Sequence, residues 1–186
     1  MDLENMSMTL YLIRHAQADE HGPKYPDDSR RSLIAEGRRQ AKALAKALGR
    51  LEIAFDRLFS SPYIRALETA EPLAKRCRTQ KVDVLSDLAT SRYPQLITQL
   101  GDNLGKHEPV DKDVDNTKRI PSDELRVALV GHEPYLSELT SYLLTGDVGA
   151  VNLKFKKAMV VQLRGKVEAG AMTLHMVVPA RVYKKL

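Results

Sequence analysis

Short apolar runs that alternate with helical stretches are the feature of this sequence that most restricts its fold. Several runs have the length of buried strands, and they span residues 10–14, 55–60, 82–85, 126–130, 155–163 and 172–178. We expect helices between them, over residues 32–50, 62–77, 96–104 and 135–144. This alternation predicts an α/β protein, a three-layer α/β/α sandwich around a mostly parallel central sheet.

The size and composition of the chain fit one globular domain. Its 186 residues can bury a core without help from disulfides or metals, and 43% hydrophobic with 28% charged residues is ordinary for a soluble protein. We therefore expect a single domain over residues 1–186. Residues 106–123 are charged and contain prolines and several aspartates, which predicts a mobile surface loop.

Cysteine usage and charge restrict the cellular compartment and the class of ligand that we expect for this protein. The single cysteine, Cys77, permits no internal disulfide and no thiolate metal site. The N-terminal residues lack the pattern of a secretory signal, and no apolar stretch is long enough to cross a bilayer. We expect a cytoplasmic protein without a membrane partner. The net charge of +5 is scattered and has few aromatic neighbours, which favours anionic substrates over nucleic acid.

An arginine and a histidine end the first apolar run. Leu10-Tyr11-Leu12-Ile13 is followed directly by Arg14-His15. Open α/β sheets build their sites at the carboxyl ends of their strands, so this pair is a candidate for function. A lone arginine or histidine at such a position is more often structural, so the pair does not establish a site by itself.

Two later segments repeat this arrangement. Ser60-Ser61-Pro62 ends a strand and begins a helix, with a serine as the expected cap and Arg65 in the first turn, which is a geometry that binds anions. The run at 127–130 is followed by Gly131-His132. Each segment alone also fits a surface arginine or a tight turn. Together with Arg14-His15 they predict a positive cluster at one sheet edge, with one nucleophilic imidazole.

With these segments in order, the sequence resembles the histidine phosphatase superfamily (phosphoglycerate mutase-like), and within it the small bacterial phosphohistidine phosphatases of the SixA type. The resemblance spans nearly the whole chain. It rests on the motifs Leu12-Ile13-Arg14-His15-Ala16, Leu33 to Ala41 around Glu36-Gly37-Arg38, Ser60 to Ala66 with Thr69-Ala70, Val130 to Pro134, and Phe155 to Ala158. Mutase and broad phosphatase branches insert a helical lid after the second arginine, and this chain has only a short helix and the polar loop there.

The resemblance implies a role for each residue of the cluster. His15 is expected to attack phosphorus and form a phosphohistidine intermediate, while Arg14, Arg65 and His132 bind the equatorial oxygens. A neutral imidazole is a competent nucleophile near neutral pH, and fixed cations stabilise the charge of a transferring phosphoryl group. We expect no metal and no other cofactor.

The proton donor for the leaving group is less determined. Larger members of the superfamily carry a glutamate after the third strand, and Asp87 lies in the matching region of this chain, which makes it the candidate acid. Asp19 and Glu133 are alternatives. A phosphohistidine substrate needs such an acid less, because the leaving imidazole is easily protonated.

Two positions depart from the pattern of the superfamily. Ala16 stands where many members have glycine, so the backbone there must accommodate a Cβ atom. Ile34 stands where the small relatives usually have threonine.

The expected partner is a phosphorylated protein with a phosphohistidine-bearing domain, which an open site admits. A small phosphate ester is the alternative substrate, and a non-catalytic phosphate-binding module is a second alternative, which the intact His15 disfavours. Phosphomutase activity ranks below these, because nothing in the sequence resembles the lid that retains an intermediate. A monomer is favoured, although the sequence does not determine the oligomeric state.

Overall fold

The structure is a computed structural model that describes residues 7–79, 81–105 and 124–183. Its centre is a six-stranded sheet with the strand order β3-β2-β4-β1-β5-β6. The strands are β1 (Met8–Arg14), β2 (Arg57–Ser60), β3 (Val82–Val84), β4 (Leu125–Gly131), β5 (Val160–Gly165) and β6 (Met172–Val178). β1 to β4 pair in parallel, whereas β5 is antiparallel to both β1 and β6. The prediction of a mostly parallel sheet is confirmed.

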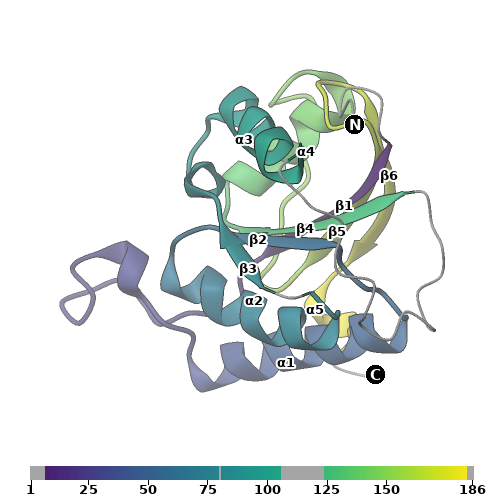
Figure 1. Cartoon of the computed structure of the whole chain (residues 1–186). Coiled ribbons are helices and arrows are strands. Elements are labelled where there is room, and N and C mark those ends of the chain that lie inside the picture. The colour runs from purple at the N-terminus through teal and green to yellow at the C-terminus, as the bar shows by residue number, and fades with distance from the viewer. Residues whose placement is uncertain (1–6, 80, 106–123, 184–186) are drawn as a thin grey trace.

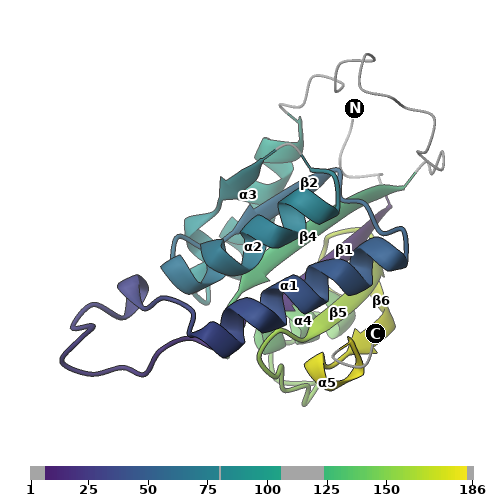
Figure 2. The ribbon, with the colours of Figure 1, turned by 90° about the horizontal axis from the view of Figure 1, so that it is seen from below.

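Helices cover both faces of the sheet, as the sandwich prediction requires (Figures 1 and 2). One face carries the long helices α1 (Ala35–Arg50) and α2 (Ile64–Arg76), which lie side by side, and the short α5 (Ala180–Tyr183). The other face carries α3 (Tyr93–Gly105) and α4 (Tyr135–Thr145). Two short 3₁₀ helices, η2 (Asp28–Arg30) and η3 (Ser86–Ala89), lie in the connections.

The central strands read as unbroken apolar runs because both of their faces are buried. In β1, Leu10 and Leu12 pack into the core beneath α3 and α4. Tyr11 and Ile13 pack into the core beneath α1 and α2. Since successive side chains of a strand point to opposite faces, a strand between two helix layers needs apolar residues at every position. The polar residues therefore begin only where β1 ends.

Three expectations need correction or lie outside the described residues. The strand expected over residues 155–163 begins at Val160 instead of residue 155, and residues 155–158 form a turn against the end of β1. Neither Ser60 nor Ser61 caps α2, whose N-cap is Tyr63 without a side-chain cap hydrogen bond. The expected loop at 106–123 lies outside the described residues. Among the residues that are described, no helix has the length and apolar character of a membrane span.

The connection from β1 to α1, residues 17–34, projects beyond the edge of the sheet at which β1 ends (Figure 1). Gly37, in the first turn of α1, fixes the base of this connection. A Cβ atom at Gly37 would lie 1.8 Å from the Gln17 carbonyl oxygen, so only glycine permits this approach. The helix thus packs directly against the chain as it leaves β1.

Candidate active site

The pairing of the central strands places the predicted residues at one edge. Arg14 is opposite Gly131 in the β1–β4 ladder, and Ser60 is opposite Val130 in the β2–β4 ladder. The ladder continues one step further, because the His15 amide donates to the Gly131 carbonyl at 3.0 Å. The residues that follow the three strands are therefore neighbours in space, although they are more than 40 positions apart in sequence.

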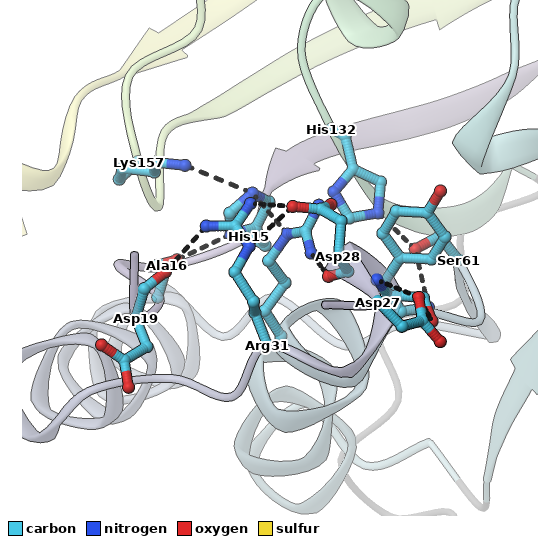
Figure 3. A network of polar contacts seen from close by, with 12 residues as sticks. His15, Ala16, Asp19, Asp27, Asp28, Arg31, Ser61, His132 and Lys157 are labelled. Atoms are coloured by element: carbon cyan, nitrogen blue, oxygen red, sulfur yellow. Dashed lines mark hydrogen bonds and ion pairs between the residues drawn. The ribbon is translucent and has the colours of Figure 1, made fainter. Parts of the chain in front are cut away.

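His15 is buried, and the backbone carbonyl of the next residue holds its imidazole in one tautomer. Its Nδ1 lies 2.7 Å from the Ala16 carbonyl oxygen, which can only accept, so Nδ1 carries the proton. Nε2 then holds the lone pair, and it accepts from Arg65 Nε at 3.3 Å (Figure 3). Burial lowers the pKa of His15 far below its ordinary value, and Lys157 and His132 lower it further. The imidazole is neutral at physiological pH, with a nucleophilic nitrogen facing a cation.

His132 lies beside His15, with ring centroids 5.0 Å apart. Its Nε2 is 2.5 Å from Ser61 Oγ, so the serine expected to cap α2 instead holds this histidine. The Tyr63 ring packs on it at 4.7 Å. Burial, followed by the charges of Arg65 and Lys157, lowers the pKa of His132 to about 3. Both histidines are therefore neutral hydrogen-bonding groups.

The two arginines reach the same place from different elements. Arg14, at the end of β1, donates from one guanidinium nitrogen to the Phe155 carbonyl at 2.6 Å. Its Nε is buried and has no hydrogen-bond partner among the described residues. Arg65, in the first turn of α2, is 5% exposed and stacks over the Tyr63 ring at 4.8 Å. Both guanidinium groups are positioned by fixed contacts, which is the preorganisation that anion binding needs.

The 17–34 segment adds a carboxylate that no pattern in the sequence selects. Asp28 accepts from Arg65 at 2.7 Å through its side chain and at 2.6 Å through its carbonyl oxygen. Arg31 forms an ion pair with the same carboxylate at 2.6 Å. Burial raises the pKa of Asp28, but the hydrogen bonds and charges of Arg65 and Arg31 outweigh it and hold the pKa below its ordinary value. Asp28 is therefore a carboxylate, not a proton donor, at neutral pH.

The carboxyl groups considered as proton donors lie elsewhere. Asp87 is buried, and its carboxylate binds Arg92 at 2.5 Å and Gln99 at 2.6 Å, both in the η3–α3 region. Asp19 points away from the histidines and pairs with exposed Lys24 (Figure 3). Glu133 accepts from the Phe155 amide and from Ser137. The structure brings Arg14, His15, Arg65 and His132 together, but it directs these three carboxylates to other partners.

Ala16, one of the two departures from the family pattern, is accommodated without strain. It is not among the residues with a positive φ, so its backbone does not require glycine. Its Cβ packs in a small buried cluster with Leu33, Ala41 and Ala158. The Ala16 amide donates to Thr69 Oγ1 at 3.0 Å. The extra methyl group thus joins the packing between β1 and α1.

Positive charge exceeds negative charge in this group. The cations whose charges act on one another here are Arg14, Arg31, Arg65 and Lys157, while Asp28 is a carboxylate paired with Arg31 and Arg65, and the charge of Glu133 acts on Arg14. Like charges at such short range oppose one another unless an anion joins them. An α/β sheet edge with a neutral histidine among fixed cations defines a protein that handles phosphoryl groups.

The chain belongs to the histidine phosphatase superfamily (branch 1), whose family model matches residues 10–109. An uncharacterized protein of Picosynechococcus sp. is 31% identical over 157 residues, which cover 84% of this chain and 85% of the relative. This membership supports phosphatase activity.

Solved structures show the same fold at low sequence identity. The protein histidine phosphatase SixA complexed with tungstate superposes with a TM-score of 0.72 at 19% identity, covering 94% of this chain and 99% of the other. A mycobacterial glucosyl-3-phosphoglycerate phosphatase with inorganic phosphate superposes with a TM-score of 0.64 at 21% identity, covering 94% and 99%. The SixA-like three-layer fold expected from the sequence is thus confirmed.

Sequence reasoning missed three side chains at this edge. Ser61 was assigned to the wrong task, as a cap instead of a partner of His132. Asp28 lies in the connection after β1, and a loop aspartate has no periodicity that selects it. Lys157 lies in the motif Phe155 to Ala158, where nothing in the sequence distinguishes it from its neighbour Lys156. Ser61 and Lys157 thus carry a signal in the sequence, since both belong to segments that resemble the family pattern, and Asp28 carries none.

Proposed function

We propose that this protein is a metal-independent phosphatase that forms a covalent phosphohistidine at His15 and removes phosphate from phosphohistidine in a signalling or phosphotransfer protein. The observation that carries the catalytic part is the state of His15. Its Nδ1 proton is held by the Ala16 carbonyl, and its Nε2 lone pair faces Arg65 inside a cluster of cations. A nucleophile needs this lone pair, and a phosphoryl group needs these charges.

The reaction then proceeds in two displacements. His15 Nε2 attacks phosphorus, the new N–P bond forms, and the bond to the leaving nitrogen breaks with its electron pair going to the leaving imidazole, which departs neutral because its other ring nitrogen has taken a proton from water. Water attacks the phosphorus in the second step, which releases inorganic phosphate and restores neutral His15. Arg14, Arg65 and His132 hold the phosphoryl oxygens throughout; contacts with Phe155 and Ser61 position Arg14 and His132, whereas Arg65 must exchange its contact with Asp28 for the phosphate.

The surroundings of the cluster favour phosphohistidine over an ordinary ester. Asp87, Asp19 and Glu133 are bound to other partners, and Asp28 is held as a carboxylate by Arg65. In the part of the chain that the structure describes, no carboxylic acid is therefore placed to protonate a leaving alkoxide. A leaving imidazole needs no strong acid, because it is easily protonated. The fold shared with SixA supports the same substrate class.

A small phosphate ester is the second candidate substrate. The fold likeness to the mycobacterial glucosyl-3-phosphoglycerate phosphatase favours it. Neither fold likeness selects a substrate, because both relatives are about one-fifth identical to this chain. The second alternative, a module that binds phosphate without turnover, leaves the neutral His15 unused. We also place the protein in the cytoplasm, where phosphotransfer domains work and where Cys77 stays a buried free thiol.

One experiment compares wild type with His15→Ala and with His175→Ala, a matched histidine exposed on β6. Each protein is incubated with a phosphorylated histidine-containing domain, and released phosphate is measured. We expect His15→Ala to lose roughly 10⁴-fold or more in rate, as covalent enzymes do without their nucleophile, and His175→Ala to be unchanged. Equal rates for wild type and His15→Ala would overturn the proposal.

Two further measurements separate the alternatives. Rapid quenching should trap an acid-labile phosphate on wild type and none on His15→Ala. Parallel rates with p-nitrophenyl phosphate rank the ester against the phosphohistidine domain, and a faster ester would favour the small-molecule function. Binding of inorganic phosphate without turnover of either substrate would favour the non-catalytic module.

A further inference from the structure

The turn at residues 155–158 is fixed to the end of β1 by hydrogen bonds in both directions. Arg14 donates to the Phe155 carbonyl at 2.6 Å, and the Ala158 amide donates to the carbonyls of Arg14 at 3.1 Å and His15 at 3.2 Å. Ala158 has a φ of 55°, a left-handed conformation that costs energy for a residue other than glycine. The surrounding contacts therefore enforce a defined position for Lys157, which lies between these anchors.

Lys157 points from this turn to the nucleophilic nitrogen of His15. Its Nζ is 3.3 Å from His15 Nε2, the same distance at which Arg65 Nε approaches (Figure 3). Its neighbour Lys156 is exposed, so the two lysines of the basic pair have different surroundings. Phosphorus bonded to Nε2 carries its oxygens into reach of any donor that already lies beside this nitrogen.

The charges around Lys157 show what this position is suited to bind. Burial lowers the pKa of Lys157 to about 8, and the positive charges of Arg14, Arg65 and Arg31 contribute, while Asp28 opposes them. The titratable and charged groups that face it are His15 and Arg14 from β1, Arg65 from α2, Arg31 and Asp28 from the 17–34 segment, and His132 after β4. An ammonium placed among cations is unfavourable until a dianion arrives.

We infer that Lys157 is a further phosphate-binding residue, whose ammonium donates to a phosphoryl oxygen and stabilises the charge of the group transferred to His15. This inference rests on the proposed function for its catalytic part, but its binding part requires only that phosphate enters the cluster. Lys157 lies beside Nε2 together with Arg65, so a phosphoryl group bonded to this nitrogen has its oxygens within reach of the ammonium.

The kinetic test compares Lys157→Gln with Lys156→Gln, the matched control in the same turn. With the phosphohistidine domain or p-nitrophenyl phosphate, we expect Lys157→Gln to lose about 10- to 100-fold in kcat/KM, less than the 10²- to 10³-fold typical of a fully buried donor. Lys156→Gln should stay within about 2-fold, as an exposed charge does. Equal values for the two variants would overturn the inference.

The pH dependence gives a readout that a structural role would not change. Lys157 carries its charge below a pKa of about 8 and loses it above, so wild-type activity should fall as the pH rises through about 8. Lys157→Arg, which keeps its charge, should retain activity at pH 9, and Lys157→Gln should lack this alkaline decline. If the activity of Lys157→Arg and Lys157→Gln falls above pH 8 as it does in wild type, another group titrates there and the role given to the charge of Lys157 is wrong.

Phosphate binding tests the inference even if no substrate is turned over. Inorganic phosphate should raise the melting temperature of wild type, because a ligand that binds the folded state stabilises it. Without phosphate, Lys157→Gln should melt higher than wild type, since it removes a repelled charge, and its phosphate-induced shift should be smaller than that of Lys156→Gln.

The outcomes are distinct from those of the proposed function. If His15→Ala matches wild type in rate but phosphate stabilises wild type more than Lys157→Gln, the nucleophile proposal fails and the binding role of Lys157 stands. If the phosphate-induced shift is the same in Lys157→Gln and Lys156→Gln, Lys157 is not a phosphate ligand. Lys157→Arg should retain the phosphate-induced rise in melting temperature. If Lys157→Gln does not fold, this rise in Lys157→Arg tests the inference in its place.

Discussion

The strand ends and the two loops that meet them contribute to the site in different ways. Arg14 ends β1, and His15 and His132 directly follow β1 and β4, which pair in parallel and fix the backbone there. Asp28 and Lys157 come from connections whose positions depend on contacts across the molecule. The ladder holds the group that would react, and the loops adjust the charge around it.

The largest difference should appear when an arginine beside the strand ends is removed. Arg65→Gln takes away both the phosphate fork and the donor at 3.3 Å from His15 Nε2. We expect kcat/KM to fall by about 10²- to 10³-fold, the usual loss for a preorganised donor. Arg39→Gln, which removes an exposed arginine of α1 paired with Glu36, should change it by less than about 2-fold. Steady-state kinetics with either substrate would rank the variants by their loss in kcat/KM. If a variant of Asp28 or Lys157 lost more than Arg65→Gln, the loops would contribute more than the groups beside the strand ends.

The strand-end histidines should also give the fold its sensitivity to acid. His132 is 4% exposed and has a folded pKa of about 3, while an unfolded histidine has a pKa near 6.5. The unfolded chain therefore binds more protons below pH 6.5, and stability is lost as the pH falls from 6.5 toward 3. This histidine should contribute a loss of about 2 kcal/mol between pH 7 and pH 5.

Urea unfolding of wild type, His132→Gln and His175→Gln at both pH values isolates this contribution. The loss of stability from pH 7 to pH 5 should be about 2 kcal/mol smaller in His132→Gln than in wild type, because the variant has no imidazole to protonate at this position. His175 is exposed, so its removal should leave the loss unchanged. Equal losses in all three proteins would show that His132 is not held neutral.

A smaller effect is expected from the carboxylate of the 17–34 segment. Asp28 occupies the Arg65 guanidinium that a phosphate would bind, so Asp28→Asn should make inorganic phosphate a better inhibitor. The pair is partly exposed on the side of Asp28, and such pairs are weak, so we expect the inhibition constant to fall by about 2- to 5-fold. Asp27→Asn is the matched control, because the neighbouring Asp27 accepts from Ser29. A rise in the inhibition constant of Asp28→Asn would mean that Asp28 assists binding.

An effect of similar, small size is expected where the 17–34 segment joins α1. Ile34 is the N-cap of α1 and has no side-chain cap hydrogen bond. Ile34→Thr should supply one and raise the free energy of unfolding by about 0.5–1 kcal/mol. Ile34→Val has the same shape without the hydroxyl group, so it should not gain this amount. Denaturant unfolding compares the two, and a similar change in both would show that shape, not capping, matters here.

Much of the fold could be predicted because local patterns and burial agree. The apolar runs of β1 and β4 are continuous since both faces are covered, and the amphipathic α1 follows from its helical spacing. The strand-end residues were predictable for the same reason, as a polar pair cannot lie inside a strand buried on both faces. The start of the strand within residues 155–163 could not be predicted, because Phe155 is as apolar as the strand that follows it. Only its contact with Arg14 shows that it belongs to a turn.

The sequence by itself determined the order of the strands and helices, the placement of Arg14, His15 and His132 at strand ends and of Arg65 in the first turn of a helix, and the superfamily. The tertiary structure decided which charges surround His15, because Asp28 and Lys157 reach Arg65 and His15 across 37 and 142 positions of the chain. Periodicity reports how a residue relates to its neighbours within one element. It carries no information on a side chain that crosses from one loop to another, and the balance of charge at this site depends on such side chains.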